Sequence, residues 1–262
     1  MGDEYLLSMS FSSPLKMDNY GFYVSSYKVN GTTEYMATTH FEATSARKAF
    51  PCFDEPLYRA TFDIAVAKLD DEIALSNMPP VGEPSKYDPT IGNRRWVTFK
   101  RTPEMPTYLV AFVVSKLKKV NTTSDKINIY VREGAENGVT EARTVVPKLL
   151  RFLENFMGVA YPLPKLDLVA IPDFPAGAME NWGLITFKED MLLVSELSAA
   201  DRLAESLRVI THEFAHLWFG DYVTLQWWNT IWQQEGMAAF MESYALDGVG
   251  ADAVDLALQV HG

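Results

Sequence analysis

His212, Glu213 and His216 belong to an H-E-F-A-H sequence, and Glu235 follows the second histidine after an 18-residue gap. In a helix, residues four apart stand on the same face, so both imidazoles can reach one ion. Two imidazole nitrogens and one carboxylate oxygen leave a fourth tetrahedral position for water, which separates a catalytic zinc site from a closed structural one. The spacing therefore predicts that His212, His216 and Glu235 bind one Zn²⁺.

Two further glutamates stand close to these ligands. Zinc lowers the pKa of its water to roughly 7, and Glu213 is suited to accept the proton and to return it to a departing amine. Glu242 follows Glu235 by two helical turns and so lies on the same face. It either hydrogen-bonds a ligand histidine or is an exposed helix carboxylate. The alternative to the whole prediction is a chance H-E-x-x-H motif, which occurs in on the order of one unrelated chain in a hundred.

Two helices must position these side chains. The first is predicted to begin next to Ser198, which forms a capping box with Asp201, and to end before Gly220. This places His212 and His216 in its last third. Glu235 lies on the next helix, after the aromatic connection W-W-N-T-I-W.

The rest of the chain predicts an α+β protein. Up to about residue 118, alternating apolar runs at 61–68, 96–99 and 108–117 indicate an antiparallel β domain, residues 1–118. Residues 119–262 form a mixed α/β domain with strands at 127–133, 166–171 and 183–187. A helix ends near Gly158, and Pro147 is expected to start or kink it because proline lacks the backbone donor.

Composition narrows the classes of function. The 262 residues are 48% hydrophobic and carry a net charge of −11 without a stripe of Lys or Arg, which argues against a nucleic-acid partner. A negative surface charge favours cationic ligands such as peptide amino termini. The commoner explanation of such a charge is an acidic surface that only aids solubility. The single cysteine, Cys52, cannot form an internal disulfide. As given, the chain shows neither a signal peptide nor an apolar run long enough to span a membrane.

A second segment suggests how a substrate is held. Gly177, Ala178, Met179, Glu180 and Asn181 place small residues, which allow close backbone approach, beside one carboxylate. Such a stretch can hold an extended peptide by its main chain. Taken alone it is equally a turn before a strand.

Four ordered motifs together resemble one family: A-R-K-A-F-P-C-F-D-E-P at 46–56, G-A-M-E-N at 177–181, H-E-F-A-H-L-W-F-G at 212–220, and W-W-N at 227–229 followed by Glu235-Gly236. The chain is similar along its length to zinc aminopeptidases of the aminopeptidase N type, which are gluzincins. The resemblance implies a thermolysin-like catalytic domain, one Zn²⁺ per chain, and removal of amino-terminal residues from peptides with a free amino terminus. It also implies that Glu180, helped by Glu42, pairs with the substrate's α-amino group, and it favours contact of Glu242 with a ligand histidine.

Departures from the family pattern limit these expectations. Gln233, Gln234 and Met237 stand where the family usually has Leu, Asn and Phe, which changes the shape of the pocket. A family tyrosine that stabilises the oxyanion lies further downstream than Gly262, so we expect a fragment with two partial domains and weak or no activity. Exposed apolar surface, including Trp227, Trp228 and Trp232, is expected with it.

Two other functions stay open. One is a fragment that binds zinc or peptide without catalysis, and the other is a thermolysin-like endopeptidase, which shares the metal site but lacks the amine anchor. Members of the family occur anchored at cell surfaces and inside cells, so the compartment is undetermined. The sequons at Asn30 and Asn121 add slight weight to the cell surface.

Overall fold

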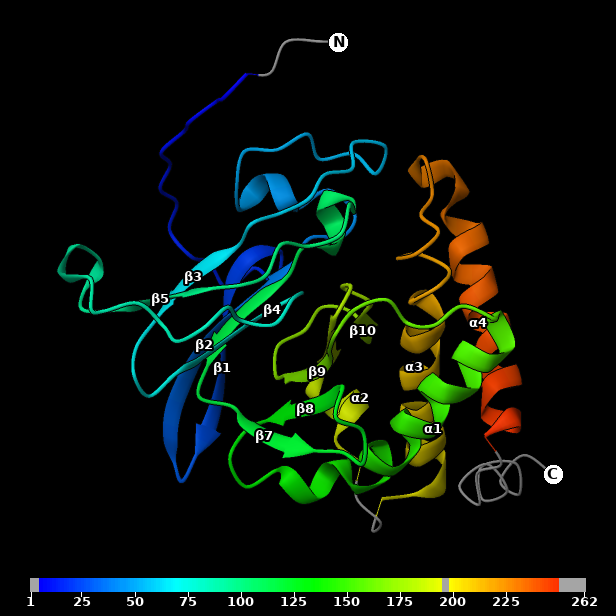
Figure 1. Ribbon diagram of the computed structural model, residues 1–262. Helices are drawn as coiled ribbons and strands as arrows, with labels where there is room; N and C mark the ends of the chain where they lie inside the picture. Colours follow the sequence, from blue (N-terminus) through cyan, green and yellow to red (C-terminus); the bar gives the residue numbers. More distant parts are fainter. Residues whose placement is uncertain (1–4, 195–197, 250–262) are drawn as a thin grey trace.

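Antiparallel strands form the framework of the N-terminal half in the computed structural model, which describes residues 5–194 and 198–249 (Figure 1). A four-stranded sheet has the order β1-β2-β6-β4 and a two-stranded sheet pairs β3 with β5. The bounds are β1 Gly21–Val29, β2 Thr32–His40, β3 Ala65–Lys68, β4 Ile73–Ser76, β5 Arg95–Thr98 and β6 Phe112–Ser115. Asn30 and Gly31 both adopt positive φ, at 51° and 82°, as the two-residue turn of the β1–β2 hairpin requires.

A five-stranded mixed sheet forms the centre of the second half, in the order β10-β11-β9-β8-β7. Its strands are β7 Lys118–Asn121, β8 Ile127–Val131, β9 Leu166–Ile171, β10 Ala178–Met179 and β11 Leu184–Lys188. All six residues of β9 are buried, because this strand lies between two parallel neighbours, β8 and β11. The strands predicted at 127–133, 166–171 and 183–187 correspond to β8, β9 and β11, so their presence is confirmed. The α+β fold class is confirmed as well.

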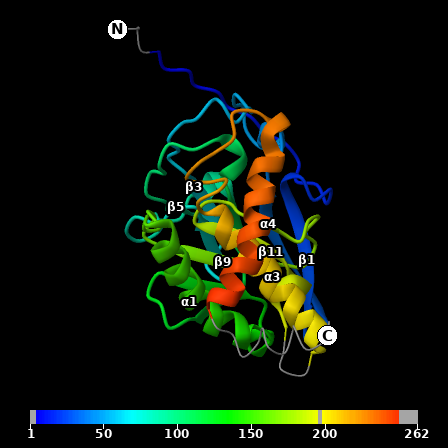
Figure 2. The same ribbon diagram turned by 90° about the vertical axis from the view of Figure 1, so that its right-hand side faces the viewer.

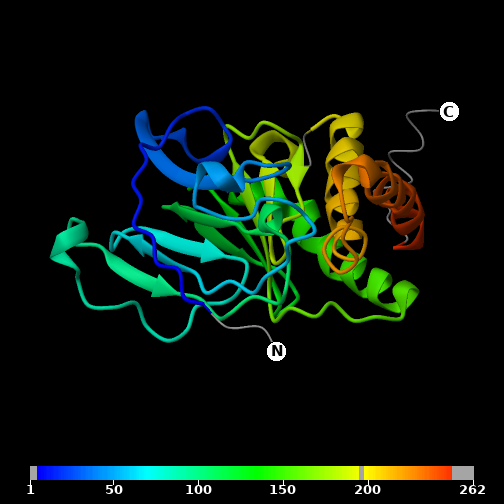
Figure 3. The ribbon, with the colours of Figure 1, turned by 90° about the horizontal axis from the view of Figure 1, so that it is seen from above.

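Three long helices gather beside the mixed sheet. They are α1 Thr140–Met157, α3 Ala200–His216 and α4 Ile231–Gly248, with the short α2 Glu189–Leu192 after β11. In Figure 2, α4 lies in front of α3, and the two pack against each other. Seen from above in Figure 3, α3 and α4 stand at the opposite end of the molecule from the β3–β5 pair. Short 3₁₀ helices occupy Ala46–Lys48, Pro89–Ile91, Thr107–Leu109, Glu136–Val139 and Trp228–Thr230.

Several predicted element boundaries are wrong. Helix α3 begins at Ala200, and its N-cap residue, Ala199, makes no side-chain capping bond, so the expected capping box does not set the start. The helix ends at His216, because the chain turns there to reach Gly220 with a φ of 150°. Helix α1 starts seven residues before Pro147, which is buried inside it, so this proline does not mark the start.

Two of the strands predicted in the first half are shorter than expected. Only 65–68 of the 61–68 run is a strand. Within 108–117, β6 covers 112–115 alone, because Thr107–Leu109 forms a buried 3₁₀ turn instead. The apolar pattern of these runs reflects burial, which such a turn satisfies as well as a strand does.

Buried polar side chains join the two halves next to the 177–183 segment. The Asn77 amide donates to the carbonyl oxygens of Leu109 at 2.7 Å and Trp182 at 2.9 Å. The Lys165 ammonium contacts the Gly183 carbonyl oxygen at 2.7 Å. Gly183 has a φ of +86°, and a Cβ there would lie 2.2 Å from the Asn77 carbonyl oxygen. The backbone that carries Glu180 is therefore held by both halves of the chain.

The expected apolar exposure is present in part. Trp227 and Trp232 are 46% and 68% exposed, whereas Trp228 is half-buried with its ring 5.2 Å from the ring of Tyr108. Within residues 5–194 and 198–249, no helix has the length and apolar character needed to cross a membrane.

Candidate active site

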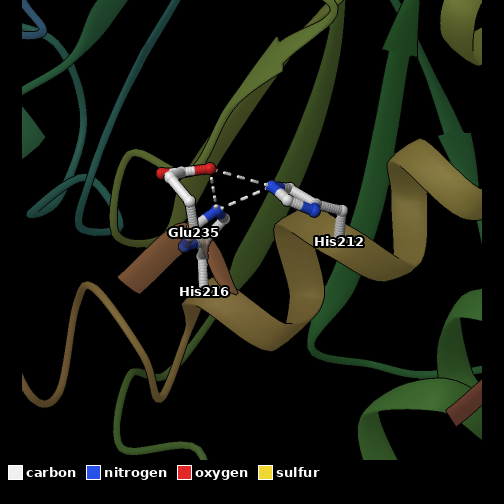
Figure 4. A group of neighbouring side chains, drawn as sticks. All are labelled: His212, His216 and Glu235. Carbon is white, nitrogen blue, oxygen red and sulfur yellow. Dashed lines mark hydrogen bonds and ion pairs between the residues drawn. The ribbon is translucent and has the colours of Figure 1, made fainter. Parts of the chain in front are cut away.

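Helix α3 presents two imidazoles from successive turns (Figure 4). The Nε2 atoms of His212 and His216 are 3.0 Å apart, and both nitrogens point toward the same space. The His216 side chain is almost fully buried and that of His212 is partly exposed. One ring is therefore fixed by packing, while the other borders solvent.

Helix α4 supplies the third side chain. The Glu235 Oε2 atom lies 3.3 Å from His212 Nε2 and 3.6 Å from His216 Nε2. Ligand atoms 2.0–2.2 Å from a tetrahedral zinc ion stand roughly 3.3–3.6 Å apart, so these separations suit one ion. Two imidazole nitrogens with one carboxylate oxygen are also donors that zinc accepts. The residues present therefore fit the metal.

The outer nitrogens of both imidazoles also have partners. His216 Nδ1 lies 2.9 Å from the Phe219 carbonyl oxygen, which can only accept, so Nδ1 carries the proton and Nε2 is left as a ligand atom. His212 Nδ1 lies 3.5 Å from Glu242 Oε2. Glu242 is thus placed beside a candidate ligand histidine rather than out in solvent.

The electrostatics of the cluster favour a cation. Burial alone would lower the pKa of His212, but contacts with Glu235 and Glu242 outweigh it and raise the value to about 9. Burial raises the pKa of Glu235, but contacts with His212 and His216 outweigh it and lower the value to about 2. Positive charge between these residues is therefore stabilised, and a divalent ion supplies that charge more strongly than a proton does.

Glu213 lies between the two histidines on α3 and borders the same cavity, whose volume is about 650 Å³. Its side chain is 5% exposed, and among the described residues its Oε2 atom has no hydrogen-bond partner. Burial raises the pKa of Glu213 to about 8, and the Glu180 carboxylate adds to the increase. A carboxyl group with such a pKa exchanges protons near neutral pH.

Two carboxylates from distant parts of the sequence meet at one end of this cavity. Glu180 follows β10 and is 4% exposed, and Glu42 follows β2. Each has a carboxylate oxygen within 4.8 Å of the other and of Glu235. Burial raises the pKa of Glu42 to about 9, and the neighbouring Glu180 charge contributes. An ammonium group placed between Glu42 and Glu180 would relieve this repulsion.

The small-residue segment is divided between the cavity and the core. Gly177 and Ala178 line the cavity together with Glu180. Met179 is buried in the core, and the Asn181 amide donates to the Leu184 carbonyl oxygen and the Thr186 hydroxyl. The side chains of Met179 and Asn181 are thus not brought into the cavity, which leaves only their main chain for contact with a ligand.

Four residues of this region were not among the predicted site residues. Gln234 donates its amide hydrogen to Glu180 Oε1 at 3.0 Å, and Gly220 makes room for it, because a Cβ there would lie 3.2 Å from the Gln234 amide. Asp221 is fully buried, and neither of its carboxylate oxygens has a hydrogen-bond partner in the described part of the chain. The Tyr108 hydroxyl donates to the Gly220 carbonyl oxygen at 3.4 Å. The departure at Gln234 was visible in the sequence, but its contact with Glu180 depends on how α4 packs.

Comparisons with known proteins identify both halves of the chain. The Peptidase M1 N-terminal domain matches residues 2–109, and the Peptidase family M1 domain matches residues 141–260. The alanine/arginine aminopeptidase of Saccharomyces cerevisiae is 43% identical over 94% of this chain and 29% of its own length. Aminopeptidase N of Bos taurus is 42% identical over 94% of this chain and 26% of its own length. Endoplasmic reticulum aminopeptidase 2 of Homo sapiens is 45% identical over 93% of this chain and 26% of its own length. The chain therefore spans between a quarter and a third of the length of these relatives.

Proposed function

Because the chain belongs to peptidase family M1, we propose that it carries the catalytic centre of a zinc-dependent aminopeptidase, which removes the first residue from peptides with a free amino terminus. One observation carries this proposal. The ligand atoms of His212, His216 and Glu235 lie within 4.8 Å of one another, and Glu235 itself lies within that distance of the Glu42–Glu180 pair. A metal site and an ammonium site thus share Glu235 as a neighbour and are separated by no more than one to two extended residues.

The carboxylate pair selects the bond that is cleaved. Glu180 and Glu42 bind the α-ammonium group of the peptide through charge-assisted hydrogen bonds. An extended chain advances about 3.3–3.6 Å per residue, so an amino terminus fixed there brings the first peptide bond beside the two histidines. Binding in this position converts recognition of the terminus into alignment of the reacting groups.

Glu213 moves the proton. Zinc bound by His212, His216 and Glu235 supplies Lewis-acid polarisation of the carbonyl group and acidification of water. Glu213 Oε2 accepts a proton from the water molecule as its oxygen bonds to the carbonyl carbon. The same carboxyl group then donates the proton to the leaving nitrogen as the carbon–nitrogen bond breaks.

Hydrolysis of alanine p-nitroanilide tests the proposal. Chelator-treated chain should show no turnover, and one equivalent of Zn²⁺ should restore it. The His212→Ala variant should neither retain zinc nor turn over. Turnover that survives the chelator would show that the metal assignment is wrong. Full zinc binding without turnover would support a binding fragment instead.

A further inference from the structure

The cavity beside the two histidines is strongly unbalanced in charge. Of the described residues, fourteen line it, and six of these are glutamates: Glu42, Glu180, Glu205, Glu213, Glu235 and Glu242. Arg208 is the only lysine or arginine among the fourteen. A peptide carries both an ammonium end and a carboxylate end. The glutamates suit the ammonium end, and the single guanidinium group suits a carboxylate.

Arg208 has hydrogen-bonding capacity that the fold does not use. Its Nε atom lies 3.9 Å from Glu242 Oε1, which is beyond hydrogen-bond distance. In the described part of the chain the Arg208 side chain donates no hydrogen bond, although a guanidinium group has five donors. Of the two lining glutamates on its helix, Glu205 is held by Arg202 at 2.7 Å and Glu213 lies beside the histidines. The Arg208 side chain is 56% exposed and free to meet a ligand.

The position of Arg208 on α3 gives the direction of the peptide. The carboxylate anchor is at the His216 end, because Glu180 Oε1 lies 3.8 Å from His216 Nδ1. Arg208 precedes His216 by eight residues, a rise of about 12 Å along the helix. An extended peptide covers that distance in three to four residues. Its third residue thus approaches Arg208 when its amino terminus is anchored by Glu180.

We propose that Arg208 binds a carboxylate of the substrate on the leaving-group side of the cleaved bond, at about the third residue from the amino terminus. This inference rests on the proposed function, which sets the end at which the amino terminus lies. The planar guanidinium group suits two parallel hydrogen bonds to a carboxylate. That carboxylate comes from the free carboxyl terminus of a tripeptide or from an acidic side chain at the third position.

A purely structural role for Arg208 has a different signature. If Arg208 only held Glu242 beside His212, its replacement would slow the hydrolysis of all peptides by the same factor. A carboxylate-binding role instead changes the ratio between peptides that differ only in that carboxylate. The ratio of kcat/KM for trialanine to kcat/KM for trialanine amide therefore separates the two roles.

The zinc-loaded chain should hydrolyse trialanine about tenfold more efficiently than its amide, since a hydrogen-bonded charge of this kind is worth roughly that factor. Arg208→Gln should bring the ratio close to one, and Arg208→Lys should keep part of it. Arg202→Gln is the matched control, because it removes the same charge from the same helix outside the cavity, and it should keep the wild-type ratio. Ala-Ala-Glu amide compared with Ala-Ala-Gln amide shows whether a side-chain carboxylate is accepted as well.

Calorimetric binding of the same peptides to zinc-free chain gives a second readout that does not need turnover. The wild-type chain should bind trialanine more tightly than its amide, and Arg208→Gln should abolish the difference. Equal binding of acid and amide by the wild type, or an acid preference that persists in Arg208→Gln, overturns the inference. If the acid preference is present but the zinc-loaded chain cleaves neither peptide, the proposed function fails and the carboxylate site stands.

Discussion

Replacing Glu180 with glutamine removes the charge of the proposed ammonium anchor while keeping its shape. Glu180 is 4% exposed, and its contacts with Gln234 and His216 both use Oε1, which leaves Oε2 for an incoming ammonium group. Truncating one partner of a buried, hydrogen-bonded charge pair costs about 2–5 kcal/mol. Glu42 reduces that loss, because without the Glu180 charge its raised pKa falls and it ionises more readily. We therefore expect Glu180→Gln to lose about 2–3 kcal/mol of binding to the ammonium group, which lowers kcat/KM by roughly 30- to 150-fold.

The assay compares trialanine with N-acetyl-trialanine at the first peptide bond, followed by mass spectrometry. Glu180→Gln should lower kcat/KM for the free amine and leave the slow cleavage of the blocked peptide nearly unchanged, so their ratio falls by the factor above. Gln234→Ala should lower the same ratio by about tenfold, because it removes one hydrogen bond to a charged group.

Glu205→Gln provides the control for this experiment. Glu205 lines the same cavity, but Arg202 holds it and it lies at the other end of α3 from His216. Glu205→Gln should keep the wild-type ratio of free-amine to blocked-peptide cleavage within about threefold, since the solvent-screened, exposed Arg202–Glu205 pair contributes little. An unchanged ratio in Glu180→Gln, or an equal fall in Glu205→Gln, would refute the anchor and favour an endopeptidase.

Glu213→Gln should keep one zinc per chain and lose about 10²–10⁴-fold in kcat, and undiminished turnover would remove Glu213 as the proton carrier. The melting temperature of the zinc-free chain should fall between pH 6.5 and 9. Although burial opposes it, the carboxylates around His212 raise its folded pKa to about 9, so its stabilisation is complete below 6.5 and lost as the pH rises through 9. Burial raises the pKa of Glu213 to about 8, so the folded state again holds the extra proton and the sign is the same; a flat or rising profile would contradict both. Gly183→Ala should destabilise the chain by about 1–3 kcal/mol in urea unfolding, because its Cβ would lie 2.2 Å from a backbone oxygen at a φ of +86°, whereas Gly177→Ala, with nothing within 4 Å, should cost far less.

Local pattern was enough for the elements whose burial is continuous or periodic. The strand at 166–171 was predicted to the residue, because an apolar run interrupted only by Asp167 is typical of a buried parallel strand. The hairpin of β1 and β2 was not predicted, although Asn30 and Gly31 are residues that such a turn prefers. The helix begins at Ala200, two residues after the predicted Ser198, because local sequence signals fix a helix end only to within one or two residues.

The sequence by itself predicted the candidate metal-binding set, because four-residue spacing on a helix dictates that His212 and His216 share a face whatever surrounds them. Family membership also followed from four motifs in order. Only the tertiary structure decided which carboxylates stand beside that set. Glu42 and Glu180 are 138 residues apart in the chain, and Gln234 reaches Glu180 only because α4 packs along α3. Long-range packing, unlike helix periodicity, has no local signature, so the closeness of Glu42 to Glu180 and the place of Arg208 in the same cavity are visible only in the folded protein.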